Sequence, residues 1–112
     1  MKSKLIFTLI LFSLSQMQAQ KIFAVERDYQ ADIKVFVADR DYNADLLVHK
    51  VAADYQAKGN EGLWFFTDAD YQADVTVFFT DHDYQADLII HFVDRDYQAK
   101  WRNKSKYHLL IP

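Results

Sequence analysis

Pairs of aspartates are the side chains in this sequence whose type and spacing come closest to a binding site. Three Asp-Xaa-Asp pairs are each followed four residues later by another aspartate: Asp39 and Asp41, Asp68 and Asp70, and Asp81 and Asp83. Calcium takes about six to eight oxygen ligands from loops that fold sharply and usually contain glycine. These segments contain no glycine, which argues against calcium binding. Calcium-stabilised repeats are therefore kept only as an alternative hypothesis, and no metal site is assigned.

Two histidines form a second possible ligand set. His49 and His91 stand 42 residues apart, at equivalent places in a long internal repeat, and two such histidines could share a metal. The chain contains no cysteine, so the ligand set is thin. A ring nitrogen bonded to the backbone is the commoner role for a histidine in a strand.

Nucleophilic catalysis has few residues to use in this chain. Cysteine is absent, and the only serine after the N-terminal segment is Ser105. Glu61 is the one carboxylate outside the repeats, close to Asn60 and Trp64. A small hydrolytic or glycan-active enzyme with Glu61 at its site is therefore the alternative function, whereas no catalytic residue and no cofactor are predicted.

The aspartates belong to a motif, Asp-Tyr-Gln-Ala-Asp, that occurs six times with small changes. The motif reads as a one-turn helical elbow whose first residue accepts hydrogen bonds from the backbone as an N-cap. The predicted caps are Asp28, Asp41, Asp54, Asp70, Asp83 and Asp96. The tyrosine that follows is predicted to lay its ring over a neighbouring strand and keep its hydroxyl in water. These aromatics are Tyr29, Tyr42, Tyr55, Tyr71, Tyr84 and Tyr97.

Short runs rich in Val, Ile, Leu and Phe separate the motifs and are typical of β-strands. Six strands are expected, at residues 22–25, 33–37, 46–51, 64–67, 75–80 and 88–93, with a seventh at 107–111. The fold class is thus mainly β with one-turn helical elbows, and an α+β arrangement is the alternative. Several of these strands are apolar on both faces, which favours strands covered on both sides.

The motifs begin at steps of 13, 13, 16, 13 and 13 residues, which indicates a pseudo-two-fold internal duplication. Placing residues 22–58 on residues 64–100 gives 21 identities in 37 positions. The last motif residue is Asp in the first two units of each half but Lys in the third, at Lys58 and Lys100. The joint between the halves holds both glycines, which suit unusual backbone angles. The residues assigned to the joint are Gly59, Asn60, Glu61, Gly62 and Trp64.

The repeated Asp-Tyr-Gln-Ala-Asp, together with the joint segment at residues 57–66, resembles the 7(1) septoil knot (Septknot) domain family. The resemblance covers residues 21–106 and implies a chain wound into a deeply knotted seven-crossing torus knot, a curve that runs twice around a ring. Equivalent strands of the two laps would then lie beside each other. The resemblance implies no catalytic residues.

The N-terminal residues 1–19 have the pattern of a cleaved signal peptide. Lys2 and Lys4 precede an apolar run at residues 5–14, and Ala19 offers a small residue for cleavage. This run is too short to span a bilayer, so no stable membrane insertion is expected after cleavage. The remaining chain keeps eleven of the thirteen basic residues and all sixteen acidic ones, a net charge of −5. That balance argues against a nucleic-acid partner.

The C-terminal segment at residues 100–108 interleaves basic and aromatic side chains. A patch for anionic glycans, lipid headgroups or single-stranded nucleic acid is one interpretation. A solvated last segment with Trp101 packed at its end is favoured, because the rest of the domain is acidic. Residues 107–112 are assigned as a C-terminal tail. The leading hypothesis is a secreted or periplasmic module, non-enzymatic, with a structural or binding role toward an unknown extracellular or envelope ligand.

Overall fold

The computed structural model describes residues 20–110, which form seven strands, six three-residue 3-10 turns and one longer 3-10 helix. The predicted signal peptide, residues 1–19, lies outside the described residues. The strands are β1 (Lys21–Ala24), β2 (Ile33–Val37), β3 (Leu46–Lys50), β4 (Leu63–Phe66), β5 (Val75–Phe79), β6 (Leu88–Phe92) and β7 (Lys100–Trp101). The first six strands match the sequence prediction to within one residue at each end, which confirms the strand pattern.

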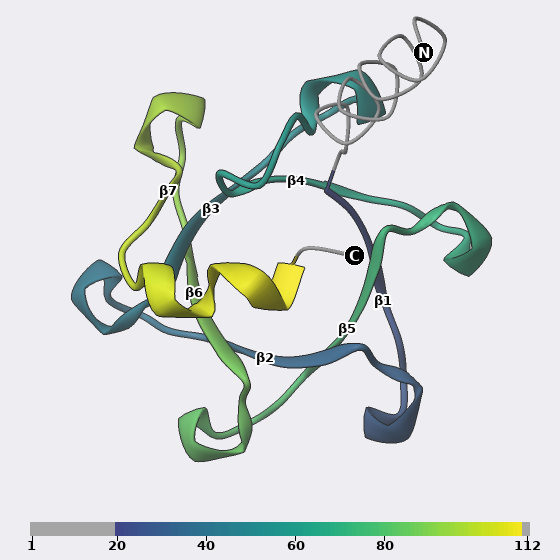
Figure 1. Cartoon of the computed structure of the whole chain (residues 1–112), viewed down its shortest axis with the longest axis horizontal. Coiled ribbons are helices and arrows are strands. Elements are labelled where there is room, and N and C mark those ends of the chain that lie inside the picture. The colour runs from purple at the N-terminus through teal and green to yellow at the C-terminus, as the bar shows by residue number, and fades with distance from the viewer. Residues whose placement is uncertain (1–19, 111–112) are drawn as a thin grey trace, which may run out of the picture.

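The six helical turns coincide with the six motifs, as the sequence predicted. They are η1 (Asp28–Gln30), η2 (Asp41–Asn43), η3 (Asp54–Gln56), η4 (Asp70–Gln72), η5 (Asp83–Gln85) and η6 (Asp96–Gln98). Each turn is closed by a backbone bond from the alanine N–H to the carbonyl of the first aspartate. We refer to each turn with its flanking residues as an elbow. Figure 1 shows the elbows projecting outward around a ring of strands.

The strands close into a six-stranded parallel barrel. Their order is β4-β1-β5-β2-β6-β3, and β3 also pairs with β4, which closes the circle. Strand β7 adds antiparallel to the start of β3, opposite Leu46 and Leu47. Because the barrel is closed, its six parallel strands leave no open sheet edge between them.

The two halves of the sequence alternate around this barrel. Strands β1, β2 and β3 occupy every second position, and β4, β5 and β6 fill the places between them. Equivalent strands pair directly, as β1 with β4, β2 with β5 and β3 with β6, which confirms the expectation from the resemblance. Parallel neighbours normally need crossovers of about a dozen residues or more. Here short elbows suffice, because each connection continues around the ring in the same direction (Figure 1).

Alternate side chains of each strand fill the barrel. Along β2 the inward residues are Ile33 and Val35, and along β5 they are Val75 and Val77. The outward residues between them are half-buried, because elbows pack against the strands from outside. The core comprises Ile22, Ile33, Val35, Leu46, Val48, Trp64, Val75, Val77, Leu88, Ile90, Trp101 and Leu110. In a chain without cysteine, burial of this apolar surface is the main stabilising contribution.

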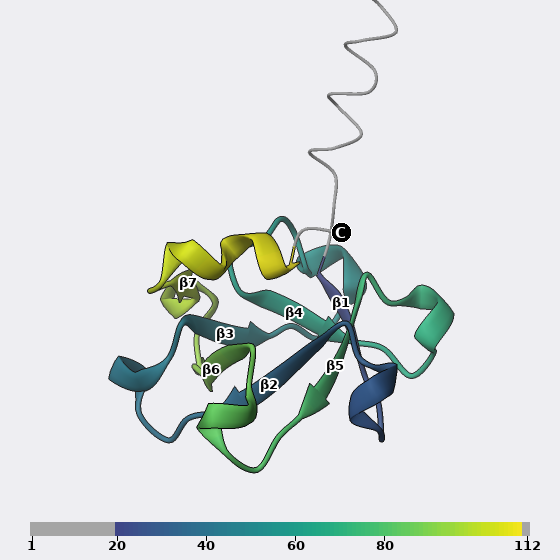
Figure 2. The ribbon, with the colours of Figure 1, turned by 60° about the horizontal axis from the view of Figure 1, so that its bottom comes forward.

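A 3-10 helix, η7 (Lys104–Leu110), covers the mouth of the barrel at the amino ends of the strands (Figures 1 and 2). The predicted strand at 107–111 is therefore wrong. Trp101 is buried and most other residues at 100–108 are exposed, as predicted, but the end of the predicted tail is not solvated. Leu110 is fully buried in the core, and the Gln20 Nε2 donates to its carbonyl at 3.1 Å. Leu109 also packs against the core, so this apolar face makes the segment a lid.

Side chains of alternating size surround the mouth at the carboxyl ends of the strands, and the three phenylalanines among them pack against the core. In barrel order the last strand residues are Phe66, Ala24, Phe79, Val37, Phe92 and Lys50. Phe66 stacks on Phe79 with ring centroids 6.4 Å apart. The Lys50 Nζ lies 4.4 Å from the ring centroid of Phe92, a cation–π distance. Each large residue comes from the second half of the sequence and fits between smaller or flexible ones from the first.

Candidate functional site

The first aspartate of the motif does not cap the elbow, contrary to the sequence prediction. In η1 the cap position is Arg27, whose backbone is extended, and no side-chain capping bond forms. Asp28 is already inside the turn, where its carbonyl accepts the N–H of Ala31 at 3.2 Å. The same correction applies to Asp41, Asp54, Asp70, Asp83 and Asp96. A carboxylate at the first helical position cannot reach back to act as the cap.

The last aspartate of the motif has the structural role instead. The Asp32 carboxylate accepts the backbone N–H of Thr76 at 2.9 Å, across the two halves of the chain. Three further bonds of the same kind run from Lys21 to Asp74, from Lys34 to Asp87 and from Ile89 to Asp45. Each bond satisfies an N–H at the start of a strand of the opposite half. The motif's final Asp therefore joins the two laps.

Replacing Asp45 by alanine is expected to lower the free energy of unfolding by about 2 kcal/mol, as for loss of charge-assisted hydrogen bonds. Its carboxylate accepts the N–H of Ile89 at 2.9 Å and the Nδ2 of Asn103 at 3.2 Å. The Lys106 Nζ lies 3.5 Å away. The matched control is Asp83→Ala, at a first motif position, which should change stability by less than about 0.5 kcal/mol. Urea denaturation of both variants decides, and equal losses would contradict the assignment.

The six motif tyrosines lie on the surface and do not brace the strands, which corrects the sequence prediction. Their exposed fractions run from 67% for Tyr42 to 84% for Tyr71. Each occupies the middle of a three-residue turn at the outer end of an elbow (Figure 1). The strands need no bracing ring, because neighbouring elbow backbones already half-bury their outer faces. Large aromatic side chains left in water are the least expected feature of this surface.

Grooves lie beside the elbows, and two of the three described below bring tyrosines near charged side chains. The first, of about 510 Å³, lies between η2 and η6. The second, of about 430 Å³, lies beside η3 and reaches Asp96 of η6. The third, of about 580 Å³, lies between η1 and η4. These volumes fall in the range of small-ligand sites, and all three grooves are open to solvent.

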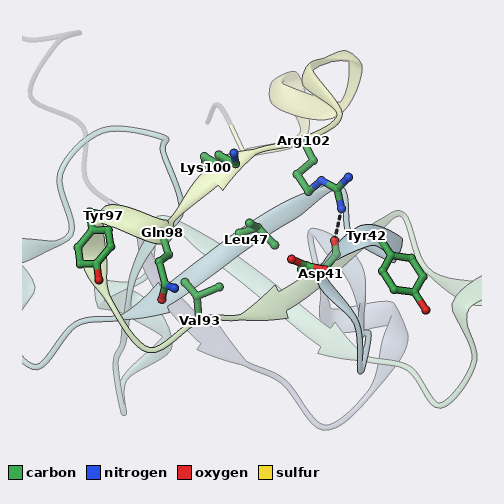
Figure 3. Close-up of a pocket in the computed structure, with 8 residues that line it drawn as sticks. All are labelled: Asp41, Tyr42, Leu47, Val93, Tyr97, Gln98, Lys100 and Arg102. Atoms are coloured by element: carbon green, nitrogen blue, oxygen red, sulfur yellow. Dashed lines mark hydrogen bonds between the residues drawn. The ribbon is translucent and has the colours of Figure 1, made fainter.

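The groove between η2 and η6, called the η2–η6 groove, is drawn in Figure 3. Tyr42 and Tyr97 stand at its two ends, and Leu47 lies between them. Lys100 and Arg102 enter from β7 and the residue after it. The Arg102 guanidinium donates to the backbone carbonyl of Asp41, which holds its charged group over the groove. Val93 and Gln98 complete the lining.

The predicted joint between the halves has the backbone that its glycines indicated. Gly59 and Gly62 have φ angles of +64° and +93°, which confirms the unusual angles. Asn60 is nearly buried; its backbone carbonyl accepts the Nε1–H of Trp101 at 2.8 Å, and its amide donates to the Tyr107 carbonyl at 3.1 Å. The joint is thus where the lid is fastened to the barrel.

The alternative enzyme site at Glu61 gains no support from the structure. Glu61 is exposed and lines none of the three grooves. Trp64 next to it is fully buried and packs edge-on against Phe66, with ring centroids 6.1 Å apart. None of the three grooves described among residues 20–110 brings Glu61 together with a second acid or base.

Neither histidines nor aspartates gather into a metal site in the described part of the chain. The Nδ1 of His49 lies 3.2 Å from the carbonyl of Val93, and that of His91 lies 2.8 Å from the carbonyl of Ala38. These are the backbone bonds expected for strand histidines. Among residues 20–110, no group of three or more His, Cys, Asp or Glu could hold a metal ion. The calcium alternative therefore has no ligand set there.

Comparison with known families decides the affiliation of the chain. The model of the 7(1) septoil knot domain matches residues 19–102. The chain belongs to the 7(1) septoil knot domain family. No curated protein and no solved structure matches it. The septoil knot match extends over both halves and the joint, and the two laps that alternate around the barrel are the winding that such a torus knot requires.

Proposed function

We propose that this septoil knot domain is a non-enzymatic binding module, secreted or periplasmic, that recognises an extracellular or envelope ligand through its ring of elbows. The observation that carries the proposal is the exposure of all six motif tyrosines, each at least two-thirds accessible. Tyrosine offers a large, stiff contact surface with a hydroxyl, at low cost in conformational entropy, and is enriched where proteins bind partners. The signal-like N-terminal sequence supports the location.

The closed barrel suits a surface that binds without changing shape. Each elbow is joined to the strands of the opposite half by backbone bonds, and four elbows also by an aspartate carboxylate. The tyrosines are therefore presented in fixed relative positions. Six similar contacts on one rigid body allow several weak contacts to act together on a repetitive ligand, such as a polysaccharide. Within residues 20–110 there is no helix of the length and hydropathy needed to cross a membrane.

The proposal is tested by replacing all six motif tyrosines with serine in the chain that begins at Gln20. Because the rings are exposed, the variant should retain its far-UV circular dichroism and melt within a few degrees of the wild type. Both proteins are then applied to an array of extracellular and envelope polysaccharides. The wild type should bind at least one of them, and the variant should lose at least about tenfold in affinity, since aromatic contacts often dominate binding surfaces. Equal binding by both, or none by the wild type, would contradict the proposal.

Replacing only Tyr71 by serine provides a graded control. Tyr71 lines none of the three grooves, so this variant should lose less affinity than the variant without all six rings. A single substitution that removed all binding would instead indicate one local site around η4.

A further inference from the structure

The two lysines that end the third and sixth motifs lie where the repeat changes its chemistry. In the other four units this position is an aspartate that binds a strand of the opposite half. Lys58 leads into the joint and Lys100 begins β7, so neither position has that role. Both lysines are exposed; Lys100 lines the η2–η6 groove, and Lys58 lines the groove beside η3.

These two grooves lie on either side of η6, which contributes to both. Tyr97 and Gln98 line the η2–η6 groove, and Asp96 lines the groove beside η3. Four cationic side chains from distant parts of the chain line the pair: Lys50, Lys58, Lys100 and Arg102. We call this surface the basic face. The barrel order brings the basic face together, because β3 lies between β6 on one side and β7 and β4 on the other.

The cations of the basic face are available to a ligand. The one ion pair among residues 20–110 joins Lys106 to Asp45, so all four are without a carboxylate partner there. Lys50 lies over the rings of Phe66 and Phe92, 5.5 and 4.4 Å from their centroids. Arg102 is held by the backbone carbonyl of Asp41 (Figure 3). A carbonyl orients a guanidinium without neutralising it, so most of its donors stay free.

The third groove shows that this charge is not general to the elbows. Its charged residues are Glu26 and Asp70, and no cation lines it. After removal of residues 1–19 the whole chain would carry a net charge of −5. A basic face on an acidic protein selects an anionic ligand and steers it to one side of the ring.

We propose that the basic face binds an acidic polysaccharide, with a carboxylated sugar seated over Leu47 in the groove whose two ends are Tyr42 and Tyr97; this rests on the proposed binding function. Lys100 and the free donors of Arg102 pair with the sugar carboxylate, which suits the planar guanidinium. The tyrosine rings at the two ends of the groove contact the apolar C–H surfaces of neighbouring sugar units, and the Gln98 amide bonds their hydroxyls. The polymer continues past η6 toward Lys58, beside Tyr55.

The test uses polygalacturonate as the probe and a form of the same polymer whose carboxyl groups have been reduced. The test variant is Lys58→Gln, Lys100→Gln and Arg102→Gln together. The matched control, Lys21→Gln, Arg27→Gln and Lys34→Gln, loses the same charge away from the basic face, since none of these residues lines either groove. All substituted positions except the half-buried Lys21 and Lys34 are exposed, and thermal melts confirm folding.

The wild type and the control should bind polygalacturonate with affinities within about threefold of each other, because distant surface charges are screened at physiological salt. The basic-face variant should lose at least about tenfold, as for removal of several charge-assisted contacts. The wild type should bind the reduced polymer as weakly as the variant binds the acidic one. Three results would each overturn this inference. They are undiminished binding of polygalacturonate by the basic-face variant, equally tight binding of the reduced polymer by the wild type, and no binding of polygalacturonate by the wild type.

The outcomes separate this inference from the function on which it rests. If the basic-face variant binds polysaccharides like the wild type while the variant without six tyrosines does not, the inference is wrong and the binding module stands. If the variant without tyrosines still binds fully, the proposed function itself is wrong.

Discussion

Replacing Gly62 by alanine is expected to destabilise the domain by on the order of 3 kcal/mol, the sum of backbone strain and overpacking. Gly62 has a φ of +93°, which residues with a side chain rarely adopt. An added Cβ would collide with the backbone carbonyl oxygen of Leu47 and come within 3.2 Å of the Ala99 Cβ. The joint cannot move away, because the carbonyl of Gly62 accepts the N–H of His49 at 2.8 Å.

Gly59→Ala is the matched control for this prediction. Gly59 also has a positive φ, +64°, but an added Cβ would meet nothing within 4 Å. Only the backbone term applies, so the loss should be about 1 to 2 kcal/mol. Guanidinium chloride denaturation, with the slope m unchanged, measures both values. Similar losses for the two variants would show that close contact with β3 is not what requires Gly62.

Replacing Trp64 by alanine is expected to cost about 3 to 5 kcal/mol, a large share of the stability of a small domain. Trp64 is fully buried and is the largest fully buried side chain of the core. Its loss would leave a cavity where β3, β4 and β1 pair, and a closed barrel cannot collapse into such a space. Denaturation followed by far-UV circular dichroism is the measurement, since the substitution removes a fluorophore.

Phenylalanine variants of both tryptophans test the hydrogen-bond part of this account. The Nε1–H of Trp64 is buried without a partner among residues 20–110, so Trp64→Phe removes an unsatisfied donor. The Nε1–H of Trp101 instead binds the carbonyl of Asn60 at 2.8 Å, so Trp101→Phe leaves that carbonyl unpaired. We expect Trp101→Phe to cost about 1 kcal/mol more. A smaller loss for Trp101→Phe than for Trp64→Phe would contradict this assignment of the two indole groups.

The basic face and the joint are the two places where the repeat is broken, and they lie next to each other around β3. Lys58 immediately precedes Gly59, and the η2–η6 groove includes Leu47, whose backbone carbonyl lies against Gly62. In four of the six units the last motif residue is an aspartate that joins the laps. The last residue of the third and sixth units does not have this role and can therefore differ. The proposed ligand contacts therefore use positions that the barrel does not need.

The sequence was sufficient for most features that depend on near neighbours along the chain, although the predicted N-caps and the predicted strand at 107–111 were wrong. A short run of β-branched and aromatic residues predicted Ile33–Val37 as a strand, because such side chains favour extended backbone. The duplication predicted that each strand of the first half has an equivalent in the second half. The two glycines predicted unusual backbone angles, and Gly59 and Gly62 have positive φ angles. The motif spacing placed all six helical turns.

Only the tertiary structure decided which motif aspartate joins the two laps and that the tyrosines are exposed to solvent. It also decided that Lys58 and Lys100 lie on the same face. Asp32 binds Thr76, 44 residues away, and no local rule identifies a partner at that distance. Tyr97 belongs to a groove with Tyr42 because the two laps interleave and bring η6 beside η2. Local sequence selects backbone conformations through short-range sterics and side-chain preferences. Contacts between the laps, in contrast, arise only when the barrel closes.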